Sequence, residues 1–551
     1  MKNALIFHCF LFFFANSIFA QINHLNSENK FTIDDSLRGS ITNERAWWDV
    51  KKYNLNLKTN LKDSSIVGSN EITYLVLNES TVMQIDLQAP LKITKIIQDG
   101  NSLNFNKNGN AFFVNLEKFQ KKGDLNVITV FYQGKPRSAI RAPWDGGIVW
   151  DKDANGNPFI ASSCQGIGAS VWWPNKDHLY DEVDGMDISI NVSSGLVAVS
   201  NGRLKNKEVL SDGTTTYNWS VVNPINNYGV NFNVGDYVSF SEKYQGEKGN
   251  LDCTYYVLKP NLEKAKIQFK DVGRMLKAFE YWFGPYPFYE DGYKLVETPF
   301  LGMEHQSDIS YGNGFKNGYQ GSDLSRTGWG MKFDFIIIHE SGHEWFGNSI
   351  TNQDRADMWI HESFTSYSES LFVEYYYGKE AGFEYVRGTR RNVLNDKPII
   401  GNYNVNNQGS GDMYFKGANM LHTLRQIVDN DTKWRQVLRG LNSKFHHQTV
   451  TTKQIEDYLS KSVGIDLTPI LNQYLRDIRI PTLEYKIIKN KLQFRWANCV
   501  SGFNMPVKVL IGAEMLWIKP NQDWKCKSIS SETTKIRIDN NFYIIENQIR
   551  K

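Results

Sequence analysis

The sequence predicts a multidomain α+β protein with a β-rich N-terminal part, a mainly helical middle and a small β module at its end. Three observations lead to this prediction. The chain has 551 residues, which exceeds the roughly 250 to 300 residues at which a single core stops growing. Apolar and polar residues alternate in the manner of strands up to about residue 241 and again from residue 481. Helical spacing dominates between these two parts.

Residues 1–20 have the pattern of a cleaved secretory signal peptide. One early lysine precedes an apolar stretch from Ile6 to Phe14, and the segment ends in a short run that closes with Ala20. A membrane anchor is the weaker alternative, because the apolar core is too short to span a bilayer and His8 interrupts it. No later run of eighteen apolar residues occurs. We therefore expect an exported mature protein, periplasmic or extracellular, without an integral membrane span.

The charge pattern argues against two classes of partner. The chain has 62 basic and 59 acidic residues, a net charge of +3, and no basic block. Nucleic acid and anionic membrane surfaces are therefore not indicated. Export would permit disulfides. Among the four cysteines after the signal peptide, Cys499 and Cys526 are the pair we favour for a disulfide, with a reduced and buried pair as the alternative.

The first domain is predicted to be all-β and to cover residues 21–245. Stretches such as 53–58, 71–76 and 186–192 alternate apolar with polar residues, are rich in β-branched and aromatic side chains, and are separated by Gly, Asn and Asp. This composition is typical of a half-buried sheet.

A helical domain is predicted for residues 246–480. Its first helix is indicated by apolar residues at helical spacing ahead of the Gly-Pro-Tyr-Pro turn at 284–287: Phe269, Val272, Met275, Leu276, Phe279 and Trp282. Short alternating strands return at 483–488 and 535–538. They predict a small β-sandwich-like module over residues 481–551.

The middle of the chain contains His339-Glu340-Ser341-Gly342-His343. Residues four apart lie on the same face of a helix, so His339 and His343 can direct two imidazoles at one point. Glu340 is displaced around the helix, where it can act as general base on a metal-activated water. Eighteen residues separate His343 from Glu362. A carboxylate there would complete a His2Glu set with an open fourth position, which is typical of catalytic zinc.

The alternative for this segment is an ordinary amphipathic helix with solvated histidines, because the HExxH pattern also arises by chance. The apolar run 333–338 instead favours a buried helix, and buried histidines and carboxylates need a partner for their polarity. Two imidazoles and one carboxylate, without cysteine, favour a single Zn2+ ion over an iron–sulfur or structural site.

Three further segments complete the candidate site. Residues 300–306 follow a strand-like stretch and are expected to form a sheet edge, which can hydrogen-bond an extended peptide. Glu304 in this segment can hold the free ammonium of a substrate. The phenol of Tyr414 precedes a predicted helix and can donate to a developing oxyanion, and the amide of Gln165 can cross the cleft from the first domain. A solvated carboxylate, a packed phenol and a loop amide are the respective structural alternatives.

The combination resembles the zinc aminopeptidases of the gluzincin clan, the family of aminopeptidase N and the leukotriene-epoxide hydrolase. His339, Glu340 and His343 match the family's HExxH pattern, and Glu362 matches its third ligand after the eighteen-residue gap. The sequence continues Trp-Phe-Gly-Asn at 345–348, as that family does.

The family's Gly-x-Met-Glu-Asn motif corresponds to residues 301–305. Met303 and Glu304 match it, whereas the first glycine and the asparagine are replaced. By resemblance Glu304 anchors the substrate amine, and Gly302 and Met303 line the bound peptide. The asparagine is replaced by His305, so the support of Glu304 differs from the family pattern.

The resemblance also assigns roles to Tyr414, as the oxyanion donor, and to Gln165, as the partner of the amine-binding glutamate. Around the third ligand the family usually has Trp-Leu-Asn-Glu-Gly-Phe, where this chain has His361 for the asparagine and Ser363 for the glycine. The neighbouring contacts are therefore expected to differ while ligation by Glu362 is retained.

The resemblance implies a β-saddle domain, a thermolysin-like catalytic domain and a small β module over nearly the whole mature chain. The family's long C-terminal helical domain has no counterpart up to residue 551, so a more open cleft, or one covered by a partner, is expected. The implied activity is zinc-dependent hydrolysis of the first bond of peptides with a free amine. A zinc epoxide hydrolase, an inactive peptide-binding exported protein and a strict endopeptidase are the alternatives, and the sequence determines neither the first-residue preference nor the oligomeric state.

Overall fold

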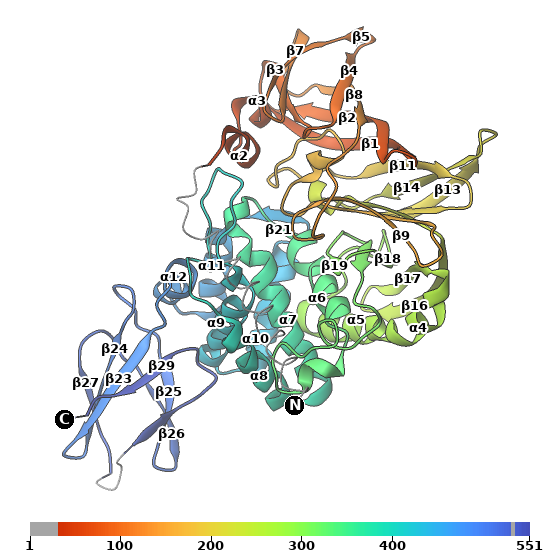
Figure 1. Ribbon diagram of the computed structural model, residues 1–551. Coiled ribbons are helices and arrows are strands. Elements are labelled where there is room, and N and C mark those ends of the chain that lie inside the picture. The colour runs from red at the N-terminus through yellow and green to blue at the C-terminus, as the bar shows by residue number, and fades with distance from the viewer. Residues whose placement is uncertain (1–30, 531–534, 551) are drawn as a thin grey trace, which may run out of the picture.

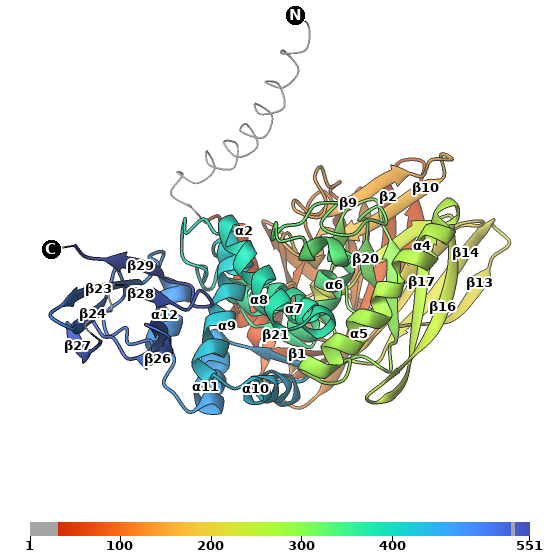
Figure 2. The same ribbon diagram turned by 90° about the horizontal axis from the view of Figure 1, so that it is seen from below.

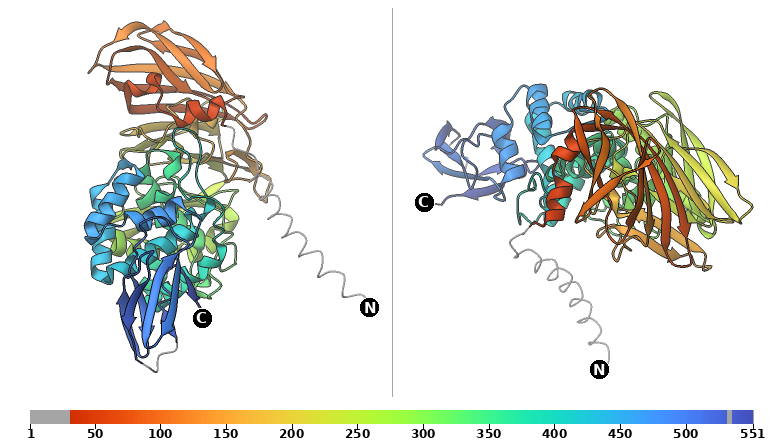
Figure 3. Two further views of the ribbon diagram at one scale, coloured as in Figure 1. Left: turned by 90° about the vertical axis from the view of Figure 1, so that its left-hand side faces the viewer. Right: turned by 90° about the horizontal axis from the view of Figure 1, so that it is seen from above.

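The computed structural model describes residues 31–530 and 535–550, and its element order confirms the predicted fold class. Figure 1 shows the β-rich part at the top, the helices in the centre and the C-terminal strands at the lower left. Figures 2 and 3 show the three parts in a row, with the helices between the two β parts. The predicted signal peptide, residues 1–20, lies outside the described residues. Within the described ranges, no helix has the length and apolar character needed to cross a membrane.

The N-terminal part is built on an eight-stranded sheet with the order β13-β14-β11-β1-β2-β8-β4-β5. β1 (Trp48–Asn60) pairs in parallel with β11 (Met186–Ser193) and antiparallel with β2 (Ser65–Val76). Alternate residues of β1 are buried, as the period of two in the sequence predicts. The remaining strands are β4 (Lys92–Gln98), β5 (Asn101–Ser102), β8 (Leu125–Gly134), β13 (Arg203–Val209) and β14 (Thr214–Val221).

Two smaller sheets complete this part. One has the order β12-β15-β10-β9 and the other β3-β7-β6. β10 (Pro158–Ser163) ends two residues before Gln165. The sheet that contains β10 therefore positions the Gln165 side chain. The other strands are β3 (Ser80–Asp86), β6 (Asn104–Asn108), β7 (Ala111–Gln120), β9 (Gly147–Lys152), β12 (Val197–Ser200) and β15 (Phe232–Gly235).

A five-stranded sheet with the order β16-β17-β18-β20-β19 lies beside the helices. Its strands are β16 (Tyr237–Gly246), β17 (Gly249–Leu258), β18 (Tyr293–Glu297), β19 (Gly302–Met303) and β20 (Ile309–Tyr311). The sequence assigned residues 237–245 to the first domain, but they form β16 of this sheet. An alternating pattern identifies a strand without stating which sheet it joins. The domain boundaries themselves stay predictions.

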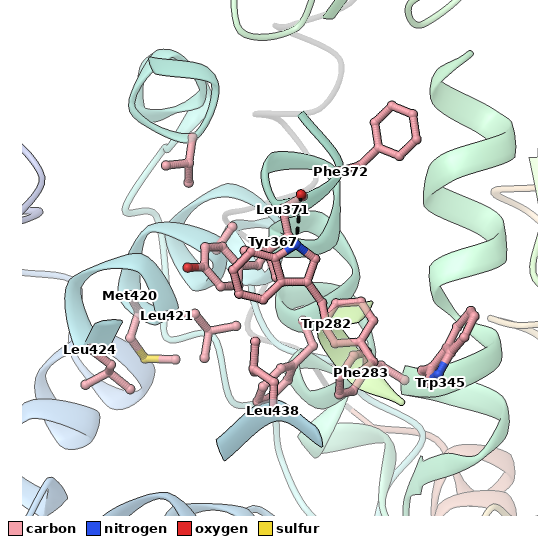
Figure 4. Packing of buried hydrophobic residues seen from close by; sticks show 14 of the residues in the cluster. Trp282, Phe283, Trp345, Tyr367, Leu371, Phe372, Met420, Leu421, Leu424 and Leu438 are labelled. Atoms are coloured by element: carbon pink, nitrogen blue, oxygen red, sulfur yellow. Dashed lines mark hydrogen bonds between the residues drawn. The ribbon is translucent and has the colours of Figure 1, made fainter. Parts of the chain in front are cut away.

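The helical centre packs around α7 (Trp359–Tyr377), whose residues from Trp359 to Val373 are all buried. Figure 4 shows Trp282 of α5 (Lys270–Phe283) beside Leu371 of α7, and Trp282 Nε1 donates to the Leu371 carbonyl at 3.1 Å. This helix, α7, is buried on all sides although it carries polar residues, among them the candidate ligand Glu362. The other helices here are α4 (Leu262–Gln268), α5 (Lys270–Phe283), α6 (Phe335–Gly342), α8 (Lys379–Gly388), α9 (Phe415–Val428), α10 (Asp431–Lys444), α11 (Thr452–Val463) and α12 (Thr468–Arg476).

The C-terminal module consists of two small sheets, with the orders β27-β24-β23-β29 and β26-β25-β28. This arrangement fits the predicted sandwich-like module. Its strands are β23 (Thr482–Ile488), β24 (Lys491–Ala497), β25 (Val507–Ile511), β26 (Glu514–Ile518), β27 (Lys525–Ser528), β28 (Ile536–Ile538) and β29 (Ile545–Gln548).

The disulfide predicted between Cys499 and Cys526 is wrong, because both thiols are free. Cys526 on β27 pairs with Gln493 on β24, and Cys499 lies beyond the end of β24. A disulfide needs Cα atoms within about 7 Å, whereas each strand residue advances the chain by about 3.4 Å. The alternative of a buried pair fails too, since Cys499 is buried and Cys526 is exposed.

The first described helices, α2 (Ile33–Gly39) and α3 (Asn43–Ala46), are fastened to the β-rich part by Arg45. Its buried guanidinium pairs with Asp86 at 2.6 Å and donates to the carbonyls of Leu37 and Ser40. A buried arginine with both an acid and carbonyl partners is well satisfied. This contact holds α2 next to the loop that carries Gln165.

His178 in the same region predicts a loss of stability in acid. Its Nδ1 accepts from the Tyr180 backbone N–H at 3.2 Å, so the proton is on Nε2, which donates to the Gly39 carbonyl at 3.3 Å. Burial, with the Arg45 guanidinium nearby, lowers the pKa of His178 to about 3. The unfolded imidazole, with a pKa of about 6.5, therefore takes up a proton that the folded one does not. The contribution of the neutral His178 imidazole to the free energy of unfolding is fully present above pH 6.5 and is lost as the pH falls toward 3.

We expect the free energy of unfolding to fall by about 1.4 kcal/mol more in the wild type than in His178→Asn between pH 7.5 and 5.5. The asparagine oxygen can still accept from the Tyr180 N–H, so the variant removes the titration and keeps this bond. Chemical unfolding at both pH values measures the difference. Equal acid sensitivity of the two proteins would contradict the prediction.

Candidate active site

His339, His343 and Glu362 meet at one point in the helical centre. The ligand atoms of the three buried side chains all lie within 4.8 Å of one another. Glu362 Oε2 is 3.4 Å from His343 Nε2 and 3.7 Å from His339 Nε2. The three predicted metal ligands are thus brought together by α6 and α7.

Local sequence explains the position of α6. Asp334 caps its N-terminus by accepting from the backbone N–H groups of Ile336 and Ile337 at 3.1 and 3.4 Å. The α-helix ends at Gly342, and His343 is its C-cap. The backbone of His343 is still right-handed, with φ −66° and ψ −18°, so the spacing of four residues keeps both imidazoles on one face.

Each imidazole is oriented by a hydrogen bond on its far nitrogen. His339 Nδ1 donates to Glu369 at 2.8 Å, and this carboxylate also accepts from Tyr385 at 2.7 Å. His343 Nδ1 donates to the Phe346 carbonyl at 3.0 Å. With Nδ1 as the donor of this hydrogen bond, Nε2 of each ring is the nitrogen directed at the cluster and available to a metal. Glu369 was not predicted from the sequence, although it lies seven residues, two helical turns, after Glu362 on α7.

The donor set fits a zinc ion. Glu362 Oε1 accepts from Tyr414, but Oε2 is buried and has no hydrogen-bond partner among the residues that the structure describes. A buried carboxylate oxygen without a partner is costly unless a cation binds it. Burial acts to raise the pKa of Glu362, but the two imidazoles outweigh this effect and lower it. Two imidazole nitrogens, one ionised carboxylate and no thiolate are the ligands of catalytic zinc sites.

Glu340 and Glu304 lie beside the ligand cluster, and one oxygen of each lies within 4.8 Å of His343 and of the other. Both carboxylates are buried. Burial raises the pKa of Glu340 to about 7 and also raises the pKa of Glu304. The Gln165 amide donates to Glu304 and, at 3.4 Å, to Glu362. The predicted contact across the cleft is therefore present.

Tyr414 lies directly before α9, and its hydroxyl donates to Glu362 Oε1 at 3.0 Å. Burial and the adjacent Glu362 raise the pKa of this phenol well above its ordinary value. Tyr414 therefore stays protonated at neutral pH and can act only as a hydrogen-bond donor to an anion. Its ring lies 6.0 Å from that of His339, measured between centroids.

Gly302 and Met303 form β19, at the edge of the five-stranded sheet, where the sequence predicts an edge strand. A Cβ atom on Gly302 would lie 3.0 Å from Glu340 Oε1 and 2.7 Å from a methyl of Ile336. Any larger residue would displace the Glu340 side chain. Met303 contacts Ser163 through its sulfur at 3.2 Å, which ties this edge to the first domain.

The two histidines that replace the expected asparagines are buried and bind backbone or hydroxyl groups. His305 Nδ1 contacts Ser310 Oγ at 3.0 Å. His361 Nε2 accepts from the Asn352 backbone N–H at 2.9 Å, and its ring stacks on Tyr228. Among the described residues, the imidazole hydrogen bonds of His305 and His361 go to groups other than the Glu304 carboxylate. The main chain of Glu304 is instead held by Asn348, which donates to its carbonyl at 2.9 Å.

These residues line one open cavity of about 550 Å³. Its wall includes the ligands, both additional glutamates, Gln165 and Tyr414. It also includes two residues that were not predicted from the sequence, Trp144, which is 65% exposed, and Arg355. No spacing rule points to either, because each reaches the cavity from a loop.

Comparison with known proteins agrees with this site. Residues 322–474 match the model of the peptidase family M1 domain. "Probable aminopeptidase 1" of Saccharolobus solfataricus is 21% identical over 91% of this chain and 62% of its own length. "Leukotriene A-4 hydrolase" of Xenopus laevis is 21% identical over 75% of this chain and 68% of its own length. The chain thus spans about 60% of the first of these relatives.

The fold resembles solved structures of the same family. The M1 zinc metallopeptidase from Deinococcus radiodurans superposes with a TM-score of 0.67 at 20% identity, over 80% of this chain and 95% of that chain. A mutant of that protein bound to a Tyr-Ser-Ala substrate gives the same TM-score at 19% identity, over 79% and 95% of the two chains. The matched domain contains all three candidate ligands and Glu340, so the part of the chain that holds the site is similar to the peptidase family M1 domain.

Proposed function

We propose that this protein is a zinc-dependent aminopeptidase that hydrolyses the first bond of peptides with a free N-terminal amine. The observation that carries the proposal is the Glu304–Gln165 pair beside the His339, His343 and Glu362 cluster, in one cavity. A buried carboxylate next to a metal can neutralise an ammonium group there. This arrangement selects the end of a chain over its interior.

The ligands assigned to zinc are His339, His343 and Glu362. When bound, zinc supplies a Lewis acid that polarises the scissile carbonyl and activates water. Glu340 accepts the proton of the attacking water and delivers it to the leaving nitrogen. Burial favours the protonated form of Glu340, so this side chain can hold the proton between the two steps.

Tyr414 donates a hydrogen bond to the carbonyl oxygen as that oxygen becomes an anion. Its hydroxyl is already within 3.0 Å of Glu362, so a small rotation brings it to a group bound beside this ligand. Glu304 and Gln165 hold the ammonium, and β19 offers edge hydrogen bonds to the extended peptide.

We expect Tyr414→Phe to lower turnover by roughly 100 to 1,000-fold, which is the usual cost of one oxyanion donor. The Michaelis constant should change little, because the bond forms mainly in the transition state. Steady-state kinetics on an unblocked dipeptide measures both. Unchanged turnover would remove Tyr414 from the mechanism.

A panel of unblocked and N-acetylated peptides tests the proposed function. The wild type should release amino acids only from the unblocked members. Glu304→Ala should raise the Michaelis constant for unblocked peptides, because the ammonium loses its partner. Cleavage of blocked peptides with equal efficiency would indicate an endopeptidase instead.

Two more functions are distinguished by extending this panel. Hydrolysis of a lipid epoxide without peptide hydrolysis would identify an epoxide hydrolase, although the amine-binding pair favours peptides. Peptide binding without hydrolysis would identify an inactive binding protein.

Export after removal of residues 1–20 is also a proposal, supported by the sequence pattern. N-terminal sequencing of the mature protein tests it.

A further inference from the structure

Arg355 places a positive charge in the wall of the active-site cavity. It lies in a short turn before α7, and its guanidinium is partly buried. Nη1 donates to the Gln165 carbonyl and Nη2 to Gln408 Oε1, each at 2.7 Å. Both partners are neutral oxygens. In residues 31–530 and 535–550, no carboxylate forms an ion pair with Arg355 within 4.0 Å.

Two other buried arginines of this chain have an acid partner, whereas Arg390, like Arg355, donates to neutral oxygens. Arg45 pairs with Asp86 and Arg425 pairs with Glu374, each at 2.6 Å. Burial, with the neighbouring Arg38, lowers the pKa of Arg355 to about 10, so it still carries its charge at neutral pH. A desolvated charge without a counter-ion is unfavourable. An anionic group bound in the cavity would remove this cost.

The position of Arg355 identifies which part of a substrate it meets. Gln165 binds Arg355 through its carbonyl and Glu304 through its side chain. Arg355 therefore binds one member of the Glu304–Gln165 pair, the pair that holds the ammonium. In a peptide, the ammonium and the first side chain are attached to the same carbon atom. The first side chain is thus the part of the substrate that can reach Arg355.

Gln408 adds a second donor at this place. It also lines the cavity, and its oxygen accepts from Arg355. Its amide nitrogen is the group left to donate to a ligand. A guanidinium and an amide side by side match the two oxygens of a carboxylate.

We propose that Arg355 is a specificity-determining residue that makes the cavity accept peptides whose first residue is glutamate or aspartate. The inference rests on the proposed aminopeptidase function. Glu304, Glu340 and Glu362 repel an acidic side chain, and Arg355 offsets this repulsion at the place where the side chain ends. Arg355 also braces the loop of Gln165, so the test must separate charge recognition from support.

Matched substrates separate these two roles. Amides of glutamate and glutamine, and of aspartate and asparagine, have nearly the same shape and differ in charge. We expect the wild type to hydrolyse the acidic member of each pair with a kcat/KM at least about tenfold higher, the lower limit for a hydrogen bond to a charged group. Loss of support alone would affect both members of a pair equally.

Arg355→Gln should shift the acidic-to-neutral ratio of kcat/KM by roughly 10 to 100-fold toward the neutral substrate. Arg355→Lys keeps the charge without the planar donors, so its acidic-to-neutral ratio of kcat/KM should lie between those of the wild type and Arg355→Gln. Arg38→Gln is the matched control, because Arg38 donates to the adjacent Gly166 carbonyl but is already paired with Asp177 at 3.5 Å. Its ratio should remain that of the wild type.

The outcomes are distinct. A wild type that does not prefer the acidic substrates overturns the assignment of Arg355, whether or not the variants fold. An unchanged ratio in Arg355→Gln also overturns it, and so does an equal shift in Arg38→Gln. In each of these cases the release of neutral amino acids leaves the aminopeptidase function standing. Release from no unblocked substrate overturns the aminopeptidase function itself.

Discussion

Removal of the metal is expected to abolish peptide hydrolysis, and one equivalent of zinc per chain is expected to restore it. The ligand atoms of His339, His343 and Glu362 lie within 4.8 Å of one another, and Glu362 Oε2 has no hydrogen-bond partner within residues 31–530 and 535–550. Without a cation, nothing in this cluster can polarise a carbonyl or activate water at neutral pH. The residual rate should therefore be that of the uncatalysed reaction.

The measurement combines activity with metal content. After dialysis against a chelator, elemental analysis should show loss of zinc in parallel with activity, and the thermal midpoint should fall because a ligand of the folded state has been removed. Adding zinc should reverse both changes in the wild type but not in His343→Ala. Full activity in protein shown to be free of metal would refute the zinc assignment.

Glu340→Gln is expected to lower turnover by roughly 100 to 10,000-fold, the range for loss of a general acid–base group. The amide has nearly the shape of the carboxylate but cannot accept the proton of the attacking water. Glu340 lies next to the ligand cluster without being one of its three ligands. The variant should therefore retain its zinc, and its Michaelis constant should stay close to that of the wild type.

Glu344→Gln provides the matched control. Glu344 is equally buried and is the next acid along the chain, but it accepts from Tyr286 and from the Ser307 backbone N–H. Its substitution should lower the thermal midpoint more than the turnover of the folded enzyme. If both variants lose turnover to the same extent with zinc in place, Glu340 has no special role. Stopped-flow or steady-state kinetics with parallel metal analysis distinguishes these results.

Much of the fold could be predicted from residue patterns. The period of two in β1 and the apolar run before His339 both reflect local geometry, which a sequence contains directly. The sheet membership of residues 237–245 and the separation of Cys499 from Cys526 depend on register and long-range pairing. Local periodicity contains no information on these, and the predicted disulfide between Cys499 and Cys526 is wrong.

Some residues of the candidate site could also be predicted from local sequence, and others could not. His339 and His343 are one helical turn apart, so their convergence follows from the sequence alone. Glu369 was within reach of the same reasoning, since it lies two turns after Glu362 on α7. Arg355 and Trp144 were not, because loops of unrelated sequence bring them to the cavity.

By itself the sequence determined the element types, the two imidazoles on one helix face and the spacing to the third ligand. These are properties of a helix, whose geometry repeats every few residues. Only the tertiary structure decided that Gln165 meets Glu304 across 139 residues and that Tyr414 meets Glu362 across 52. It also decided that Arg355 lines the cavity and, among the described residues, forms no ion pair with a carboxylate. Such contacts arise from the packing of separate elements, which side chains distant in the chain determine together.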